Sequence, residues 1–560
     1  MGKRFLVFCV LYLVMHPAVL AQEGGGGSLI SHVVYEKAYL HVDRETFAPR
    51  EDIWFKVYLV SGISNQLISG YKNVYIHLVN DSGRVVRERL LLVHNGVADG
   101  DIRIPYGIGD GQYTLQAFTR YQQNFGEESY YHKKIWISQS MRQQGQTGPG
   151  ELEEIDVSFY PEGGNLVMNA SNSIAFKAVN EKGRGIPVSG NIINDQGDTL
   201  TMFSTSFLGM GKFALMPEPG RAYVAVLDAY PDFSYAFGDI QENGVSLQFR
   251  DGPAAVKFGI ARNFNANSRE VFRLEASHKG ILLFSTMMEL DSFYGEIEIS
   301  KEKFPLGISK ITLKHTGGRI LAERLVFIRV DEPPAVRIET SQEAYNSRSK
   351  VELGFSYPDS ETDSIPGGLS VAVINSDYLL HDGYDSDIRS YLLLDSELKG
   401  PVESTAAYFR DTPGLSVAQK LDLLMMVQGW RSYYWPEIIA MEPDSLQGWE
   451  DVGIDIRGYV KRLFRDNRVG DARVVLGPLA GGLSYLGTTT EEDGSFGFNR
   501  LFLRDSSMLL LQAETRSGGK MVEIIVEDLF IPDQSADQVT IDAVTPDPLV
   551  PSSYYSGNFS

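Results

Sequence analysis

Side chains that could bind a metal or carry out catalysis are sparse in this chain of 560 residues. The histidines occur singly, whereas a zinc peptidase needs two histidines and a carboxylate around one metal. His32 and Glu36, or His41 and Glu45, are four residues apart, and a strand separates such pairs by about 13 Å. We therefore interpret the histidines after the leader as solvated strand residues. They are His32, His41, His77, His94, His132, His278, His315 and His381.

Sequence motifs for nucleophilic catalysis and phosphate binding are also missing. The chain has no GxSxG elbow, no Walker A sequence and no dinucleotide-binding glycine pattern. Its single cysteine, Cys9, lies in an apolar run that we assign to a cleaved leader. The exported chain would therefore hold no disulfide, no thioester and no lipid anchor. We expect no enzyme activity and no cofactor.

Three carboxylates in the sequence HDGYDSDI form a candidate calcium site. They are Asp382, Asp385 and Asp387, and calcium prefers oxygen ligands of this kind. The spacing and the terminal glutamate of an EF-hand are missing. We favour a solvated loop without metal.

Aromatic residues gather in GWRSYYW, residues 429 to 435. Trp430, Arg431, Tyr433 and Trp435 could anchor a partner protein or a glycan. Aromatic side chains at a domain junction are more often core, so we favour a hydrophobic plug that holds a helix against a sandwich.

The elements that would position these residues are mostly strands. Ile53, Phe55, Val57 and Leu59 alternate with Trp54, Lys56 and Tyr58, which predicts a strand with one buried face and one wet face. Pro49 interrupts the ladder before this strand. Longer units recur: residues 74–118 and 188–226 each hold a strand, an Asn-Asp-x-Gly hairpin turn and further short strands. A looser copy spans residues 472–514.

The predicted fold is mainly β, with tandem immunoglobulin-like or macroglobulin β-sandwiches, one of which has a helical insertion, and a C-terminal transthyretin-like sandwich. Residues 388–435 switch to helical spacing, and Ser416 with Gln419 forms a capping box. The predicted boundaries are a leader at 1–21, a linker at 22–31, sandwiches at 32–138, 155–240, 245–332 and 335–450, a linker at 139–154, a C-terminal domain at 453–530 and a polar tail at 531–560.

Composition and the first residues indicate the compartment. Lys3 and Arg4 precede an apolar run from Phe5 to Val14, with small residues before Gln22, which is typical of a secretory signal peptide. No other stretch has the roughly 20 apolar residues of a spanning helix. The net charge is −21, and nucleic acid is an unsuitable partner because phosphate binding needs a basic patch.

Several quoted stretches resemble a known family. AYLHVDRETFAPREDIWFKVYL (38–59) resembles the opening of a macroglobulin domain, and YPEGGNLV (160–167) resembles the start of a neighbouring one. Together with MMVQGWRSYYW and GIDIRGYV, the set is similar to Gram-negative envelope proteins that join macroglobulin domains to a carboxypeptidase regulatory-like domain. Longer members continue into a TonB-receptor plug-like domain. Pro49 is followed by Arg50 where the family has glycine, so we expect the turn to lack a positive φ.

The resemblance implies a non-enzymatic scaffold of the periplasm or outer membrane, with secretion as an alternative, that binds an outer-membrane or secreted protein and takes part in TonB-dependent transport. A non-covalent endopeptidase inhibitor without a thioester is the alternative function. In PEGG, Gly163 and Gly164 are expected to form a tight turn, with Glu162 capping local N–H groups.

Overall fold

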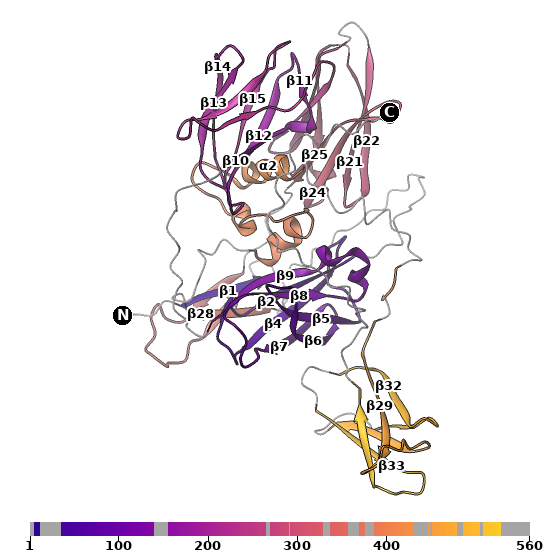
Figure 1. Cartoon of the computed structure of the whole chain (residues 1–560). Coiled ribbons are helices and arrows are strands. Elements are labelled where there is room, and N and C mark those ends of the chain that lie inside the picture. The colour runs from indigo at the N-terminus through magenta and orange to yellow at the C-terminus, as the bar shows by residue number, and fades with distance from the viewer. Residues whose placement is uncertain are drawn as a thin grey trace.

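The computed structural model gives the chain as a string of β-sandwiches joined by a helical segment (Figure 1). It describes residues 35–138, 155–264, 269–290, 292–328, 336–356, 369–375, 386–429, 446–448, 451–478, 485–503 and 508–527, and the main chain of residues 5–11. The prediction of a mainly β chain built from sandwiches is confirmed. Among the helices within these ranges, none is long and apolar enough to cross a membrane.

Sandwich 1, residues 35–138, is one folded sheet of eight strands in the order β2-β4-β7-β6-β5-β8-β9-β3. All neighbours are antiparallel except β3 and β9. The sheet curls so that β2 contacts β8 and β9. The strands are β2 (Glu36–Val42), β3 (Thr46–Phe47), β4 (Asp52–Ser61), β5 (Tyr71–Asn80), β6 (Val85–His94), β7 (Val97–Arg103), β8 (Gly111–Phe118) and β9 (Tyr131–Ile137).

The alternation in β4 is confirmed on one face and wrong at one position of the other. Ile53, Phe55 and Val57 are buried in the core of sandwich 1, and Trp54 is 57% exposed. Tyr58, expected on the wet face, is fully buried. Its hydroxyl donates a hydrogen bond to a strand that crosses this face, so a segment distant in sequence covers what the local pattern marks as a wet face.

The turns of sandwich 1 follow their residue types with one exception. In the hairpin between β5 and β6, Asn80 accepts a hydrogen bond from the Arg84 N–H and Gly83 has φ 78°, as predicted. The turn at Pro49 differs from the prediction, because Arg50 takes φ 72°. Its guanidinium lies 4.1 Å from the ring centre of Tyr106. This cation–π contact offsets part of the backbone strain.

Sandwich 2, residues 155–241, packs a β10-β12-β15 sheet against a β14-β13-β16-β17 sheet. A small parallel pair, β11 with β18, closes one end. The predicted turn after β13 is confirmed, with Gly197 at φ 85°. The strands are β10 (Ile155–Pro161), β11 (Leu166–Val167), β12 (Asn172–Asn180), β13 (Ser189–Asn194), β14 (Thr199–Ser204), β15 (Met210–Leu215), β16 (Tyr223–Leu227), β17 (Ser234–Ala236) and β18 (Ile240–Gln241).

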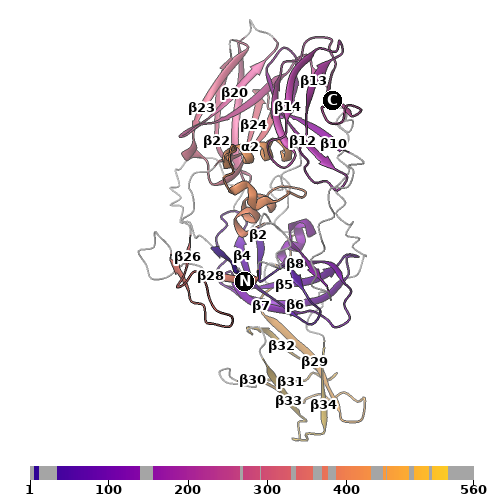
Figure 2. The same cartoon turned by 90° about the vertical axis from the view of Figure 1, so that its left-hand side faces the viewer.

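Sandwich 3, residues 245–328, has the sheets β19-β20-β23 and β22-β21-β24-β25 around a core of its own. It stands beside sandwich 2 at the upper end of the molecule in both views (Figures 1 and 2). The strands are β19 (Val245–Asp251), β20 (Ala255–Arg262), β21 (Glu270–His278), β22 (Ile281–Leu290), β23 (Tyr294–Ser300), β24 (Gly307–His315) and β25 (Ile320–Ile328).

The next part of the chain is less regular. Strands β26 (Arg337–Thr340) and β27 (Leu353–Ser356) pair only with each other. Strand β28 (Leu369–Asn375) pairs with β1 (Phe5–Leu11), which lies inside the predicted leader. The described residues of this region thus form two separate pairs of strands. The domain boundaries drawn from the sequence stay predictions.

The helical segment, residues 386–429, holds α1 (Ile388–Ser390), a π-helical turn at Tyr391–Asp395, a 3-10 turn at Thr405–Phe409 and α2 (Val417–Gln428). The capping box of α2 is confirmed, because Ser416 Oγ accepts from the Gln419 N–H and Gln419 Oε1 accepts from the Ser416 N–H. The packing differs from the prediction. Instead of lying on a fourth sandwich, α2 contacts β25 of sandwich 3 and β10, β12 and β15 of sandwich 2.

The C-terminal sandwich, residues 451–527, pairs a β32-β29-β34 sheet with a β31-β30-β33 sheet. It projects from sandwich 1 at the lower end of Figure 1. Its strands are β29 (Ile454–Arg462), β30 (Arg473–Pro478), β31 (Leu486–Thr489), β32 (Ser495–Leu501), β33 (Leu509–Glu514) and β34 (Val522–Val526).

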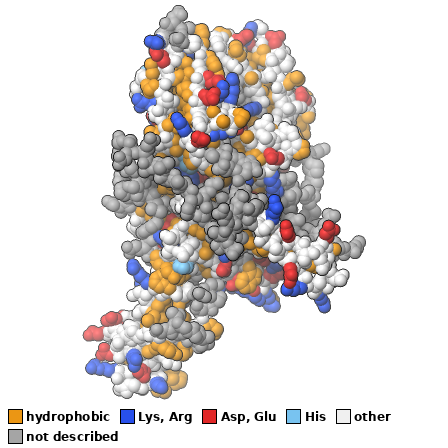
Figure 3. Space-filling model, turned by 180° about the vertical axis from the view of Figure 1, so that it is seen from behind, with side chains coloured by type: hydrophobic (Ala, Val, Ile, Leu, Met, Phe, Trp, Pro, Cys, Tyr) orange, Lys and Arg blue, Asp and Glu red, His pale blue; other side chains and the backbone are white. Residues whose placement is uncertain are grey.

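On the face of the whole molecule shown in Figure 3, the acidic and basic side chains of the described residues are intermixed.

Candidate functional site

Most site residues predicted from the sequence lie outside the described residues. These are Trp430, Arg431, Tyr433 and Trp435 of the aromatic cluster, and Asp382 and Asp385 of the candidate calcium site. Asp387 is described, and it caps α1. Its carboxylate accepts a hydrogen bond from the Ser390 N–H at 2.8 Å, and Ser390 Oγ accepts one from the Asp387 N–H at 2.9 Å. This carboxylate therefore has a structural role in starting the helix.

The interpretation of the histidines as solvated is wrong for several of them. His77 and His278 are 8% and 9% exposed, and His41 is partly buried. Burial lowers the pKa of His77 to about 4. The pKa of His278 is also lowered to about 4, mainly by burial and next by the positive charge of Lys279. The alternation of apolar and polar residues along a strand does not predict this burial, because segments distant in sequence cover the faces on which these histidines lie. In the described ranges, no three histidine, cysteine or carboxylate side chains gather as a metal site.

One serine–histidine contact resembles part of a catalytic arrangement. Ser370 Oγ of β28 lies 2.7 Å from His41 Nδ1 and accepts a hydrogen bond from the Tyr58 hydroxyl, also at 2.7 Å. Burial, and next the charge of Lys133, lower the pKa of His41 to about 4. A base of that pKa removes a serine proton poorly at neutral pH. The three side chains instead fasten β28 to β2 and β4 of sandwich 1.

The most highly organised set of side chains lies where the helical segment meets the sandwiches. Leu421, Leu424 and other residues of α2 form one buried apolar cluster with side chains from all three sandwiches. The sandwich residues of this cluster are Tyr35 of sandwich 1, Ala175 and Met210 of sandwich 2, and Ile308 and Leu325 of sandwich 3. Tyr391 extends the contact, since its ring meets those of Tyr39 and Tyr131 in sandwich 1.

A first ion cluster crosses this junction between sandwich 1 and sandwich 3. Glu397 of the helical segment pairs with Lys37 of β2, and its Oε1 lies 3.3 Å from Lys279 Nζ at the turn after β21. Lys37, Lys279 and Glu397 are 1%, 4% and 2% exposed. Lys279 also donates to the carbonyls of Gly62 at 2.7 Å and Ile63 at 3.1 Å. One carboxylate therefore faces two buried ammonium groups that come from different sandwiches.

Opposing effects act on the pKa of Lys37 in this cluster. Burial lowers the pKa of Lys37 to about 8, while Glu397 acts to raise it and Lys279 acts to lower it. A charge without a partner at this depth would cost several kcal/mol, so the carboxylate is what allows the lysines to meet here.

A second ion cluster ties sandwich 2, sandwich 3 and α2 together. Arg324 Nε of β25 lies 2.6 Å from Glu162 Oε1, and its Nη2 lies 2.5 Å from Asp422 Oδ1 of α2. Lys212 of β15 reaches the other oxygen of Asp422 at 2.8 Å. Burial acts to raise the pKa of Asp422, but Arg324 and Lys212 outweigh it and leave that pKa below its ordinary value. The carboxylate is therefore charged at neutral pH.

Glu162 has a different role from the predicted local cap. It is 6% exposed, pairs with Arg324 and accepts a hydrogen bond from the Phe249 N–H in sandwich 3 at 2.7 Å. The tight turn at Gly163 and Gly164 is confirmed, with φ values of 79° and 94°. A Cβ on Gly163 would lie 2.9 Å from the Leu247 Cβ, so glycine is also needed for the approach of the two sandwiches.

Sequence reasoning missed the ion clusters. The signal was present as charged residues within apolar strand segments. Lys37 lies in EKAYLHV and Arg324 lies in ILAERLVFI, where each interrupts a run that otherwise reads as core. Nothing in the local pattern identifies their partners, which are hundreds of residues away for Lys37 and about a hundred away for Arg324 with Asp422.

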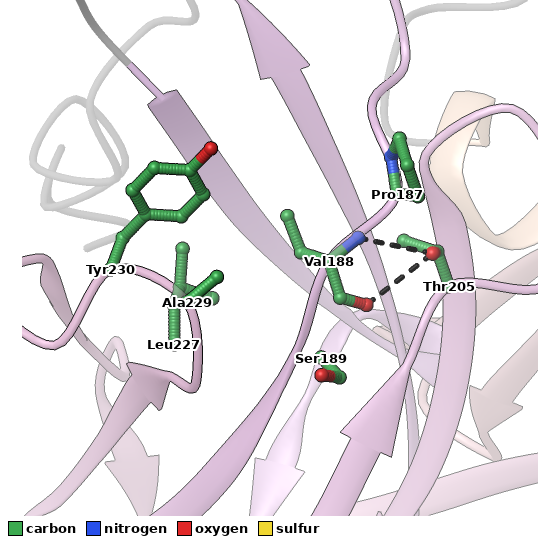
Figure 4. A pocket seen from close by; sticks show the side chains of 7 residues that line it. All are labelled: Pro187, Val188, Ser189, Thr205, Leu227, Ala229 and Tyr230. Carbon is green, nitrogen blue, oxygen red and sulfur yellow. Dashed lines mark hydrogen bonds between the residues drawn. The ribbon is translucent and has the colours of Figure 1, made fainter. Parts of the chain in front are cut away.

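The described residues of sandwich 2 hold a pocket of about 290 Å³ where three of its strands end (Figure 4). The residues that line it are uncharged. Thr205 Oγ1 accepts a hydrogen bond from the Val188 N–H and donates one to the Val188 carbonyl. Ser189 donates to Asp228 Oδ2 at 2.7 Å. Such a pocket suits a neutral group with apolar and hydroxyl surface. The lining residues are Pro187, Val188, Ser189, Thr205, Leu227, Ala229 and Tyr230.

Comparisons with known proteins give structural likeness at low levels. No family model and no curated protein match the chain. Dimeric latent PorU from Porphyromonas gingivalis matches over 53% of this chain and 34% of its own, with 13% identity and a TM-score of 0.26. E. coli α-2-macroglobulin in its native conformation matches over 90% of this chain and 41% of its own, with 10% identity and a TM-score of 0.17. The elastase-activated form covers 88% and 43%, with 10% identity and a TM-score of 0.19. The chain spans less than half the length of these proteins, and such values assign no family.

Proposed function

We propose that this protein is an exported, non-enzymatic scaffold of the Gram-negative cell envelope that binds a protein partner in connection with TonB-dependent transport. The observation that carries the proposal is the junction, where the helical segment and two buried ion clusters join three sandwiches into one body. A body of this kind holds distant surfaces at fixed separations, which is what a scaffold requires. The sequence resemblance supports the envelope location.

The buried charges favour a structural role for the junction over a catalytic one. Glu397 Oε1 is shared by two lysines, and the two oxygens of Asp422 are bound by Lys212 and Arg324. A carboxylate held in this way is neither a free base nor an open ligand for a metal. The binding surfaces that remain are the outer faces of the sandwiches and the neutral pocket of sandwich 2.

The proposal is tested by cross-linking and mass spectrometry on intact envelopes of cells that express the tagged protein. We expect reproducible cross-links to one outer-membrane or transporter-associated protein. The Ala229→Trp variant fills the sandwich 2 pocket from an exposed position and shows whether the partner uses it; Gln196→Trp, also exposed in sandwich 2 but away from the pocket lining, is the matched control.

Two results would contradict the scaffold role, and a third would contradict the absence of enzyme activity. One is the capture of no envelope protein. The other is cleavage of the purified protein at a single site by a protease that then stays bound and shielded, which would favour the inhibitor function. A substrate turned over by the pure protein, with the activity lost on changing one side chain, would show that it is an enzyme.

A further inference from the structure

Strand β28 pairs along one edge with β1 and with no other described strand. All seven of its residues pair in antiparallel register with β1, from Leu369 opposite Leu11 to Asn375 opposite Phe5. Among the described strands, β1 is its only partner. Residues 5–11 belong to the predicted leader, so export would take away the one strand that covers this edge.

Strand β28 is also held by sandwich 1. Ser370 is held by His41 and Tyr58 of sandwich 1. Ala372 is 5% exposed, whereas Val371 and Val373 are 40% and 58% exposed on the opposite face. The strand thus remains fixed to sandwich 1 by one face after the leader has gone.

We propose that the edge vacated by the leader binds an extended, uncharged, apolar strand of a partner polypeptide by strand addition. The inference rests on the proposed function, because export is what removes β1. An open edge presents a row of unpaired N–H and C=O groups, which another strand satisfies. The strand seen there, FLVFCVL, has no charge, and neither does LSVAVIN of β28. The partner segment is therefore of the same type, an apolar strand without charged residues.

The test measures binding of a dye-labelled peptide with the sequence of residues 5–11, with Cys9→Ser and a lysine tail for solubility. The processed chain, which starts at Gln22, should bind it. The full chain with Ala21→Leu, which blocks cleavage, should bind at least about tenfold more weakly because its own strand occupies the edge at high effective concentration. Equal binding to both chains would overturn the inference.

Peptide N-methylation keeps the test independent of any variant that fails to fold. In an antiparallel ladder the N–H groups of alternate residues point toward the partner strand. Methylating the amides of residues 6, 8 and 10 and methylating those of residues 5, 7, 9 and 11 should therefore differ by at least about tenfold in affinity. The same loss from both sets, or from neither, would contradict strand addition.

The remaining outcomes separate this inference from the proposed function. Binding that depends on the methylated set supports the edge site even if envelope cross-linking fails. Binding without that dependence overturns the edge site even if envelope cross-linking succeeds. A dimer of the processed chain that the peptide dissociates in sedimentation would assign the edge to a second copy and overturn the partner assignment.

Discussion

Replacing Glu397 by glutamine tests the first ion cluster most sharply, because the change keeps the shape of the side chain and removes its charge. Lys37 and Lys279 would then face each other at 1% and 4% exposure without the charge of Glu397. Lys279 keeps its hydrogen bonds to two carbonyls, whereas Lys37 keeps, among the described residues, a contact with the Leu392 carbonyl at 3.5 Å. We therefore expect Lys37 to lose its proton in the variant.

The expected loss of stability follows from the pKa of Lys37. With that pKa at about 8, neutralising Lys37 at pH 7 costs about 1 kcal/mol. The lost charge-assisted contact of Lys279 adds about 2 kcal/mol. The junction in Glu397→Gln should open more easily by about 3 kcal/mol at pH 7 and by about 2 kcal/mol at pH 9, where Lys37 is already neutral in the native protein.

The assay is hydrogen exchange at the amides of residues 392–398, which reports the free energy of local opening. The matched control is Glu352→Gln, which removes an ion pair with Lys350 that is largely exposed and should leave exchange unchanged. In the native protein the folded state releases the Lys37 proton near pH 8 and the unfolded state near 10.5, so this group stabilises the fold increasingly as pH rises through that window. An effect of Glu397→Gln that matches the control, or that is the same at pH 7 and pH 9, would show that Glu397 does not hold the junction through the charge of Lys37.

Three further substitutions test the second ion cluster, the N-terminal cap of α2 and a buried histidine. Asp422→Asn should loosen α2 by about 3 kcal/mol in the same exchange assay, because Arg324 stays buried without one of its partners; protection equal to that of the native protein would contradict the second ion cluster. Ser416→Ala should cost about 1 kcal/mol through loss of the α2 cap, seen as faster exchange in the first turn, with Ser82→Ala as an exposed control. His77→Gln should flatten the fall in thermal stability between pH 6.5 and 4, because burial lowers the pKa of His77 to about 4 and only the unfolded ring gains a proton in that window. The difference should reach roughly 3 kcal/mol at pH 4, and parallel pH profiles for the two proteins would show that the ring is not responsible.

Local signals in the sequence predicted the local structure well. The buried face from Ile53 to Leu59, the turns at Asn80 and Asn194 and the capping box at Ser416 are all present, because each depends on residues within one strand or one turn. These features place β4, the hairpin between β5 and β6, the turn after β13 and the start of α2.

The junction could not be predicted because it depends on contacts between distant segments. Tyr58 and His41 alternate as wet-face residues, yet β28 covers them from more than 300 positions away. Glu162 reads as a loop carboxylate, and only the approach of sandwich 3 turns it into a buried partner of Arg324. The residue type of Arg50 predicts a negative φ, and its stacking on Tyr106 helps it adopt a positive one.

If the helical segment joins sandwiches 1 to 3 into one rigid body, the distance between two of these sandwiches is fixed and can be measured directly. The only native cysteine is Cys9, so Asp81→Cys in sandwich 1 and Thr316→Cys in sandwich 3 can carry two spin labels on the processed chain. Pulsed electron spin resonance should give one narrow distance distribution, which broadens when Glu397→Gln and Asp422→Asn are combined. A broad distribution in the native protein, or one that the two substitutions leave unchanged, would contradict the claim.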